Sequence, residues 1–415
     1  MYRAPRGTSD ILPGEQAYWR YVEQKVVDIC QLYGYERIDS PVFEDTGLFT
    51  RSVGPGTDIV EKEMYTFTDK GGNQVTLRPE GTAPVCRAYL EHGLHNLPQP
   101  VKLYYLAAVF RYERPQAGRY RQHHQFGFEA IGDASPALDA EVIDMSWQFF
   151  LSLGLRHLSL LLNSIGCRQC RPGYLRRLEE YYAGHAEALC PDCKVRLERN
   201  TLRLLDCKQP TCQKLAGLAP RSADNLCPDC ATHFDQLKRY LDRLEIPYAV
   251  NHRLVRGLDY YTRTVFEIQP MSGGSQSTLG GGGRYDDLIE ELGGKPTPAI
   301  GLAAGIERMI LNLKQQGVAV PPLAKPGVFL AHIGEEARDE AMKLASGLRR
   351  SGTGVILATG NRSLKAQLRQ ANSAGVRYAV IMGEEEIRAG KVILRDMVNA
   401  EQQSVPMSEL PALLG

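Results

Sequence analysis

The pattern of apolar and polar positions predicts helices and strands in alternation along most of the chain. Apolar residues recur at helical spacing over 14–33, and Gly34 ends that period. Two short alternating runs, 64–68 and 74–77, flank a polar turn at 69–73. Because alternation bounded by Asp, Gly and Asn is typical of paired strands, we predict a β-hairpin in this region.

A second, longer antiparallel pair is predicted around a polar loop at 115–121. The run 101–110 is almost wholly apolar, and 124–131 reads as the returning strand. Successive side chains of a strand point to opposite faces, so Gln125 and Glu129 share one face. The pair therefore presents two polar groups in the same direction.

The remaining elements of this part of the chain are shorter or less regular. Between 165 and 240 the composition shifts to cysteine, arginine and short helical patterns, and we predict an insertion into the sheet. The other predicted elements are helices at 82–92 and 137–153, a strand at 35–42, and a strand followed by a helix over 299–316, and the sheet is predicted to resume at 249–269.

A proline-rich linker at 321–326 separates a different pattern at the C-terminal end. Strands and helices alternate beyond it, which predicts a small α/β domain built from βαβ units. The predicted strands are 328–333, 354–358 and 378–382, and the predicted helices are 335–350 and 363–374.

Composition narrows the class of protein. A length of 415 residues favours two or three domains. A net charge of +1 excludes a generally basic nucleic-acid binder, so an RNA partner would be held by local patches. The sequence shows neither an apolar run of transmembrane length nor a signal-peptide core, and we expect a cytoplasmic protein with reduced thiols and no membrane association.

Cysteine usage is uneven. Cys30 and Cys86 stand singly in apolar contexts and are predicted core residues. The other eight form four pairs, Cys167/Cys170, Cys190/Cys193, Cys207/Cys212 and Cys227/Cys230. Paired cysteines in an intracellular chain indicate structural Zn²⁺, in one site or two, while reduced free thiols remain the alternative. A catalytic metal is not expected.

The segment 256–267 places Arg256, Asp259, Tyr260 and Tyr261 just before an apolar strand-like run. Arginine offers a fixed fork of donors for a carboxylate or phosphate, and tyrosine offers a rigid wall with a polar tip. Such a cluster fits a small zwitterion bound beside a phosphate. The alternative is a surface strand with a solvated ion pair.

Four segments, 75–82, 109–129, 256–267 and 301–308, together resemble the histidyl-tRNA synthetases, which are class II aminoacyl-tRNA synthetases. Phe-Arg-x-Glu within the second and Gly-x-x-x-Gly-Ile-Glu-Arg in the last are patterns of the class. Arg-Gly-Leu-Asp-Tyr-Tyr in the third is specific to the histidine branch. The resemblance begins at Arg6 and covers nearly the whole chain.

The resemblance implies an α+β fold with a class II antiparallel sheet flanked by helices. The catalytic domain would span 1–320 and contain the insertion at 165–240, and 326–415 would be an anticodon-binding α/β domain. Family members are homodimers, and the helix and strand near 35–50 resemble the part of the class that lies at the dimer interface.

The resemblance also implies the reaction. L-histidine and ATP, the latter with Mg²⁺, would form histidyl-adenylate, and the histidyl group would pass to the 3′ end of tRNA(His). In-line displacement at phosphorus needs positioning and neutralisation of charge. By resemblance Arg111 holds the α-phosphate, Arg308 holds the far phosphates, and Arg256 is the electrophilic catalyst.

Histidine binding is assigned, again by resemblance, to residues from four segments: Glu80, Gly81, Thr82, Gln125, Glu129, Tyr260, Tyr261 and Tyr285. Glu80, Thr82 and Gln125 would hold the α-ammonium end. Glu129 with Tyr261 would pair with the imidazole. A site that pairs buried polar groups with a ring rejects amino acids without them by roughly 10⁴–10⁵.

The basic loop 114–121 would face the acceptor end of the tRNA, with Gln116 and Arg121 as candidates for contacting its first base pairs; the alternative is a solvated hairpin tip. His123 and His124 are adjacent and would point to opposite faces of a strand, as structural or loop residues.

A regulatory alternative has the same catalytic-domain fold: the synthetase-like subunit of ATP phosphoribosyltransferase in histidine biosynthesis. That paralogue generally lacks the anticodon-type domain and the ATP-binding arginines. Here Arg111, Arg256 and Arg308 are all present, and 326–415 supplies the extra domain. Both features favour the ligase, and the segment 256–261 argues against another class II synthetase.

Overall fold

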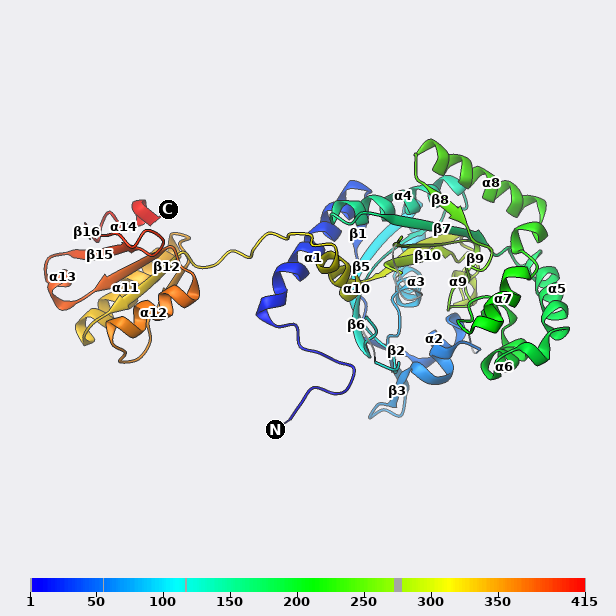
Figure 1. Ribbon diagram of the computed structural model, residues 1–415, viewed down its shortest axis with the longest axis horizontal. Helices are drawn as coiled ribbons and strands as arrows, with labels where there is room; N and C mark the ends of the chain where they lie inside the picture. The colour runs from blue at the N-terminus through cyan, green and yellow to red at the C-terminus, as the bar shows by residue number, and fades with distance from the viewer. Residues whose placement is uncertain (1, 55, 116–117, 272–277, 415) are drawn as a thin grey trace. The chain divides into compact units, whose positions relative to one another are not determined.

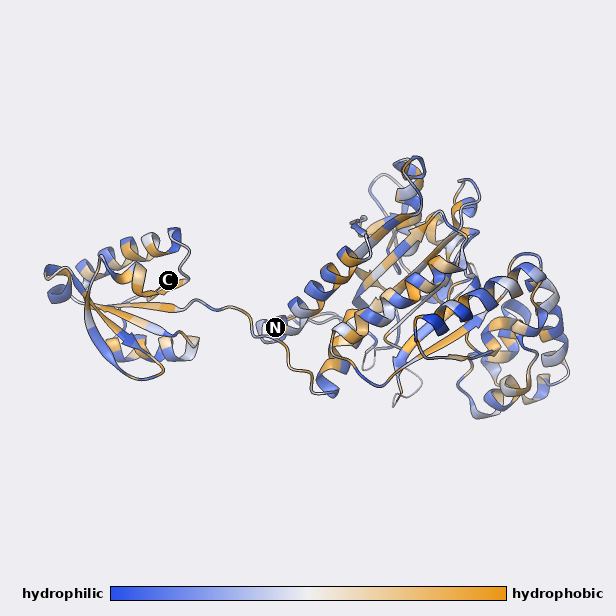
Figure 2. Ribbon diagram, turned by 90° about the horizontal axis from the view of Figure 1, so that it is seen from above, coloured by the Kyte–Doolittle hydropathy of each residue, from blue (hydrophilic) through white to orange (hydrophobic). Residues whose placement is uncertain are grey.

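The computed structural model describes residues 2–54, 56–115, 118–271 and 278–414. The chain forms two compact units, Met1–Pro321 and Pro322–Gly415, and each unit contains its own sheet and its own hydrophobic core (Figure 1). Apolar residues gather along the strands of both sheets and on one side of most helices (Figure 2). Within the described ranges, none of the helices combines the length and the apolar character needed to cross a bilayer.

An eight-stranded sheet organises the first unit. Neighbouring strands are antiparallel except at the two edges, where β1 pairs with β5 and β7 pairs with β8 in parallel. In spatial order the strands are β1 (Glu36–Arg37), β5 (Val101–Phe110), β6 (Gln122–Ile131), β11 (Ala299–Gly305), β10 (Gly280–Arg284), β9 (Thr262–Pro270), β7 (Leu158–Ser164) and β8 (Tyr248–Val250). The predicted class II sheet is confirmed.

Helices cover both faces of this sheet because its strands carry apolar residues on both sides. Along β9, Phe266 packs into one core cluster and Val265 into the other. The helices in the first cluster are α1 (Gln16–Leu32), α4 (Pro136–Ser152), α8 (Pro228–Arg243) and α10 (Ile306–Gln315). Those in the second include α3 (Thr82–Glu91) and α5 (Arg171–Ala183).

A small three-stranded sheet lies beside the main one. It consists of β2 (Phe43–Asp45), β4 (Gln74–Leu77) and β3 (Tyr65–Thr68), and the last two form the predicted hairpin. Asp69 closes the hairpin turn by accepting hydrogen bonds from the backbone N–H groups of Gly71 and Asn73, both at 2.8 Å. Short helices α2 (Thr46–Ser52) and α9 (Leu288–Glu291) pack nearby.

One predicted strand is wrong in extent. The strand expected at 35–42 is reduced to β1 and ends before Pro41 is reached. The sheet resumes over 249–269 as predicted, in two strands: β8 ends at Val250, and β9 begins at Thr262. The segment between them leaves the sheet and carries Arg256 and Tyr260 into a cavity.

Residues between β7 and β8 fold as a helical insertion. Helices α5 and α8 form its two ends, with α6 (Pro191–Arg199) and α7 (Pro210–Leu218) between them. Each of the four helices has a proline in its first turn, where the missing N–H costs no intrahelical hydrogen bond. The insertion contributes cysteines and leucines to the second core cluster.

The second unit contains a five-stranded sheet in the order β13 (Val355–Leu357), β12 (Val328–His332), β14 (Tyr378–Met382), β15 (Lys391–Asp396) and β16 (Gln402–Pro406). The first three strands are parallel, which confirms the predicted βαβ units, while β15 and β16 add an unpredicted antiparallel edge. Its helices are α11 (Glu335–Arg350), α12 (Leu364–Ala374), α13 (Glu384–Arg388) and α14 (Leu410–Leu414).

Candidate active site

A cavity of about 510 Å³ opens in the first unit over strands β6, β9, β10 and β11. Side chains from segments far apart in the sequence line its wall. Those that the sequence also predicts are Glu80, Thr82, Arg111, Gln125, Glu129, Arg256, Tyr260, Tyr261, Tyr285 and Arg308. The fold thus brings together the candidate histidine-binding and ATP-binding residues, with acidic groups in one part and arginines in another.

The acidic part is built on Glu80 and Glu129, which are 3% and 1% exposed. Glu80 accepts hydrogen bonds from the backbone N–H groups of Thr82 and Ala83, at 2.7 and 2.8 Å, and so holds the start of α3. Glu129 accepts hydrogen bonds from the hydroxyls of Thr82 at 2.8 Å and Tyr285 at 2.5 Å. One hydrogen-bonded chain therefore runs from α3 to the end of β10.

Burial raises the pKa of both carboxyl groups. For Glu129 the pKa rises to about 8, because desolvation outweighs the hydrogen bonds from Tyr285 and Thr82. The pKa of Glu80 is also raised by burial, against the hydrogen bonds from Ala83 and Thr82 and the charge of Arg111. The cavity therefore contains a carboxyl group that titrates close to neutral pH.

Glycines make room for these side chains. A Cβ on Gly301 would lie 1.8 Å from a carboxylate oxygen of Glu129. A Cβ on Gly81 or on Gly127 would lie 2.3 Å from ring atoms of Tyr105, whose ring packs between these two glycines. Gly81 therefore makes room for Tyr105, and it does not itself line the cavity. Tyr105 was not among the predicted site residues.

Three tyrosines form the wall beside Glu129. The rings of Tyr260 and Tyr261 have centroids 4.8 Å apart, and those of Tyr260 and Tyr285 are 5.7 Å apart and edge-on. All three side chains are buried, and burial raises the pKa of each phenol. They therefore remain neutral hydroxyl groups, suited to hydrogen bonding with a polar ring.

Arginines line the other part of the cavity. The Arg111 guanidinium donates from Nε to the carbonyl of Pro79 at 2.7 Å. Arg308 donates from Nε to the carbonyl of Gly118 at 3.0 Å and from Nη1 to that of Thr278 at 3.2 Å. Burial lowers the pKa of Arg308, and the neighbouring positive charges of Arg119 and Arg111 lower it further. Such crowding of positive charge favours an anionic ligand.

Arg256 is held by a partner that the sequence pattern did not indicate. Its guanidinium forms an ion pair with Glu267 of β9, and the hydroxyl of Thr278 donates to the same carboxylate at 3.1 Å. A Cβ on Gly281 would lie 2.5 Å from Nη1 of Arg256, so the glycine strand leaves space for the guanidinium. The pKa of Arg256 is raised overall. Burial by itself would lower this pKa, but the charge of Glu267 and the phenol of Tyr261 have the larger, opposite effect.

The two adjacent histidines point to opposite faces, as predicted. His124 lies on the core side, with Nδ1 2.9 Å from a carboxylate oxygen of Glu307 and its ring edge-on to Trp19. The sequence pattern predicts only a structural or loop role for His123, whereas the structure places it in the cavity. The signal was present, since His123 continues the two-residue alternation of Gln125 and Glu129.

His123 is electrically neutral in this position. Burial lowers the pKa of its imidazole to about 3, and the charges of Arg111 and Arg308 act in the same direction. A neutral imidazole adds hydrogen-bonding capacity beside the arginines without adding another positive charge.

The predicted tRNA-facing loop is described only in part. Gln116 lies outside the described residues. Arg121 does not line the cavity: its guanidinium stacks on the ring of Tyr112 at 3.7 Å, and its backbone N–H donates to Gly7 at 2.7 Å. Arg119 of the same loop does line the cavity and was not among the predicted residues.

A buried ionic network supports the cavity from beneath the sheet. Arg284, at the end of β10, and Asp139 of α4 are both fully buried and approach within 2.6 Å. Asp139 also accepts a hydrogen bond from the hydroxyl of Thr264 at 2.6 Å and lies 2.8 Å from Nε2 of His233. Arg284 immediately precedes Tyr285, so this network fixes the end of the strand that presents a cavity tyrosine.

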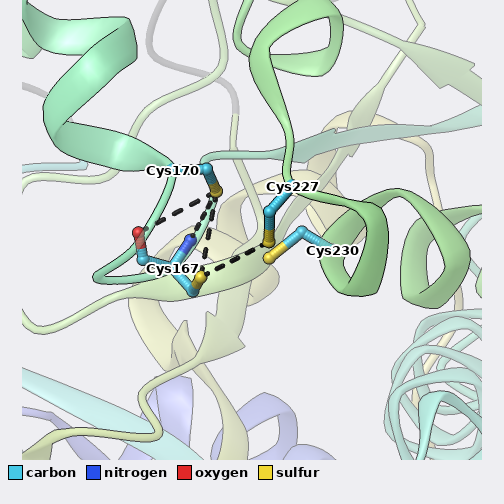
Figure 3. A group of neighbouring side chains, drawn as sticks. All are labelled: Cys167, Cys170, Cys227 and Cys230. Carbon is cyan, nitrogen blue, oxygen red and sulfur yellow. Dashed lines mark hydrogen bonds between the residues drawn. The ribbon is translucent and has the colours of Figure 1, made fainter.

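The eight clustered cysteines form two groups. One comprises Cys167, Cys170, Cys227 and Cys230, and the other comprises Cys190, Cys193, Cys207 and Cys212 (Figure 3 shows the first). Within each group all four sulfur atoms lie within 4.8 Å of one another. All are free thiols. The eight cysteines thus fall into two separate groups, while Cys30 and Cys86 are buried core residues as predicted.

Comparison with known proteins covers the whole chain. The family profile of histidyl-tRNA synthetase matches residues 7–169 and 198–309, and that of the anticodon binding domain matches 318–415. A histidine–tRNA ligase of Dehalococcoides mccartyi is 63% identical over 410 residues, which cover 99% of this chain and 98% of the relative. One of Pelotomaculum thermopropionicum is 52% identical, covering 97% and 95%.

Solved structures include a histidyl-tRNA synthetase that aligns with the whole chain. The crystal structure of apo S. aureus histidyl-tRNA synthetase aligns over 100% of both chains with a TM-score of 0.83 and 38% identity. A Bacillus halodurans protein described as an ATP phosphoribosyltransferase regulatory subunit/histidyl-tRNA synthetase aligns over 92% of this chain and 98% of its own, with a TM-score of 0.66. At 23% identity the latter likeness concerns the fold alone.

Proposed function

This chain belongs to the histidyl-tRNA synthetase family and is a histidine–tRNA ligase, and we propose that both steps of its reaction take place in the cavity over β6, β9, β10 and β11. The proposal rests on one observation: the cavity is divided into an acidic, tyrosine-lined part and an arginine-lined part. Its acidic and tyrosine-lined part suits a small cation with a polar ring, and its arginine-lined part suits a triphosphate.

The acidic part binds L-histidine. Glu80 and Gln125 accept hydrogen bonds from the α-ammonium group, with Thr82 beside them. Glu129 and Tyr261 pair with the imidazole nitrogens. The contacts of Glu129 with Thr82 and Tyr285 support this assignment, because both of its oxygens are already fixed in position. A site fixed in this way leaves unpaired polar groups when an amino acid without the ring enters, which costs binding energy.

The arginine-lined part binds ATP. Arg111 neutralises the α-phosphate, Arg308 the far phosphates, and Arg256 the charge that develops at the α-phosphorus. Mg²⁺ accompanies ATP, and the carboxylates of Glu113 and Glu267 on the cavity wall are the oxygen donors that this cation prefers. In the first step a histidine carboxylate oxygen bonds to the α-phosphorus, and the bond to the β-phosphate oxygen breaks to release pyrophosphate.

In this step the protein acts by positioning and electrostatics. The attacking carboxylate is already ionised, so no general base is required. Negative charge moves onto the leaving pyrophosphate, where preorganised guanidinium groups stabilise it. In the second step the 3′-terminal ribose hydroxyl of the tRNA loses its proton and bonds to the carbonyl carbon of the adenylate, and the bond from that carbon to the phosphate oxygen breaks to release AMP.

The tRNA contacts extend beyond the cavity. We assign the anticodon of tRNA(His) to the unit Pro322–Gly415, whose sequence matches the anticodon binding domain. Gln116 and Arg121 remain the candidates for the acceptor end, and the position of Arg119 on the cavity wall supports an approach along this loop. The enzyme would work in the cytoplasm without a membrane partner, where charged tRNA is consumed.

Assembly as a homodimer is supported by exposed apolar side chains in the predicted interface region. Val42 and Phe43 are 45% and 54% exposed. Phe67 lies outside this region, on β3 of the same small sheet; it is 46% exposed, and its ring is edge-on to that of Phe43 with the centroids 6.5 Å apart. Such residues are candidates for burial against a second copy.

The cysteine-rich insertion would hold structural and not catalytic Zn²⁺.

The full-length ligase relatives support the ligase and not the regulatory alternative. We propose ATP–pyrophosphate exchange as the assay that tests the assigned cavity. Histidine should drive exchange, and other amino acids should not. An exposed arginine outside the cavity, replaced in Arg20→Ala, serves as the matched control for changes at the cavity arginines. Absence of histidine-dependent exchange in a folded, ATP-binding preparation would count against the assigned cavity.

A further inference from the structure

We infer that the chain contains two structural zinc ions, one in each group of four cysteines, and that the two ions stabilise different parts of the insertion. The neck site is formed by Cys167, Cys170, Cys227 and Cys230, and the inner site by Cys190, Cys193, Cys207 and Cys212. The inference rests on the geometry of the thiols and is independent of the assignment of the active site.

The spacing of the sulfur atoms fits a tetrahedral metal ion. Cys167 Sγ lies 3.8 Å from both Cys170 Sγ and Cys227 Sγ, and Cys190 Sγ lies 3.8 Å from Cys207 Sγ. Four ligands at a Zn–S distance of about 2.3 Å in a tetrahedron are separated by about 3.8 Å along each edge. A disulfide would instead place two sulfurs about 2.05 Å apart. Both groups therefore have the dimensions of a metal-bound tetrathiolate.

The two sites share a local motif. Residues 190–193 and 227–230 both read Cys-Pro-Asp-Cys, and each begins a helix with the first cysteine at the N-cap. The backbone angles of the two N-caps agree, with φ of −67° and −68° and ψ of 160° and 162°. Helix N-termini favour thiolates through their free N–H groups. The same turn thus presents two sulfurs in the same way at each site.

Each motif pairs with a second pair of cysteines that lies elsewhere in the sequence. The pairs converge although 60 residues separate Cys167 from Cys227 and 17 separate Cys190 from Cys207. Backbone N–H groups point at the sulfurs, with Cys167 N donating to Cys170 Sγ at 3.3 Å and Cys190 N donating to Cys212 Sγ at 3.4 Å. Such N–H contacts orient and stabilise the ligands of a metal site.

The insertion also needs a stabilising element of this kind. Helices α6 and α7 have nine residues each, which is too short for independent stability. The cysteines take core positions there: Cys193, Cys212 and Cys230 are at most 1% exposed. Small helical domains with limited cores are commonly held together by metals.

The two sites occupy different places. The neck site joins the start of the insertion, just after β7, to the first turn of α8, and so closes the loop where it leaves the sheet. Its neighbour Arg171 donates a hydrogen bond to the carbonyl of Tyr261, which connects the neck to the tyrosine wall. The inner site lies wholly within the insertion, and its Cys207 reaches the cavity lining.

Metal content of the full-length protein tests the inference directly. Protein purified without a metal-affinity tag should contain two zinc ions per chain by elemental analysis. Cys230→Ser and Cys193→Ser should each contain one, because each removes a ligand from a different site. Cys86→Ser is the matched control: it also changes a fully buried cysteine, but one outside both groups, and it should retain two.

A second measurement uses only the wild-type protein and so does not depend on whether the variants fold. Wild-type protein stripped of metal and titrated with Co²⁺ should develop thiolate-to-cobalt absorption that saturates at two equivalents, and Zn²⁺ should displace it. Saturation at one equivalent, iron in place of zinc, or four disulfides with no bound metal would each overturn the inference. So would an equal loss of zinc from Cys86→Ser and Cys230→Ser.

Discussion

Glu129 illustrates how burial sets the chemistry of a single residue. Its pKa is raised from 4.5 to about 8, so between these values the folded state binds a proton that the unfolded state has lost. The stabilisation due to this group is therefore complete below about pH 4.5, the ordinary value that applies to the unfolded chain, and is lost as the pH rises towards 8.

The variant Glu129→Gln should remove this dependence. Relative to the variant, the wild type should lose stability by up to about 1.4 kcal/mol per pH unit as the pH rises from 5 to 8. Chemical unfolding of the first unit at several pH values measures the difference. Glu180→Gln, at an exposed position outside the proposed dimer interface, should leave the pH profile unchanged. Parallel profiles for the wild type and Glu129→Gln would contradict the raised pKa.

Arg256 is the residue on which the proposed electrophilic role rests. Arg256→Ala should leave a folded protein but lower histidine-dependent pyrophosphate exchange by roughly 10²–10³, the scale of losing one preorganised charge donor. Arg20→Ala should retain full exchange. Near-normal exchange in Arg256→Ala would remove this residue from the mechanism.

At the scale of an element, β10 is held in place by the ion pair beneath it. Its glycines admit the Arg256 guanidinium on the cavity side, while Arg284 at its end is tied to Asp139. The strand itself contributes little packing, because four of its five residues have no side chain. Its position therefore depends on the buried charges.

Asp139→Asn should destabilise the first unit by up to about 3–5 kcal/mol, because it removes the fully buried charge partner of Arg284 and leaves that guanidinium only the less buried Asp286, at 3.0 Å. Urea unfolding measures this change. Asp235→Asn on α8 is a matched control, since the side chain of Asp235 is 71% exposed and its ion pair with Lys238 contributes little. Equal midpoints for the two variants would show that the network does not stabilise the strand.

At the scale of the whole molecule, the first prediction concerns assembly. If the region near 35–50 builds a homodimer, light scattering should give twice the chain mass at working concentrations. Phe43→Asp should weaken association, because it places a charge on an apolar side chain that the dimer would bury. An active wild-type monomer would contradict the proposed dimer.

The second whole-molecule prediction concerns the division of labour. The unit Pro322–Gly415 has its own sheet and core, and the described cavity is lined only by residues of the first unit. A chain ending at residue 321 should keep measurable histidine-dependent pyrophosphate exchange while charging tRNA far more slowly. Full tRNA charging would refute this division, and equal loss of both activities in a folded dimer would also count against it.

The sequence by itself determined much of the local structure. The helices over 14–33, 82–92 and 137–153 and the hairpin at 64–77 follow from periodicity and turn residues, and the structure has them within a few residues. The motifs that resemble the histidyl-tRNA synthetases also led to Arg111, Arg256 and Glu129, and the structure brings these three side chains to one cavity. Periodicity is local, so it can be read without the fold.

Only the tertiary structure decided which distant groups meet. It pairs Arg256 with Glu267, places His123 in the cavity, and divides eight cysteines into two groups of four. It also shortens the strand near Pro41 and lifts the segment before Thr262 out of the sheet. These outcomes depend on packing between segments far apart in the chain, where burial and charge are set by neighbours that no local pattern contains.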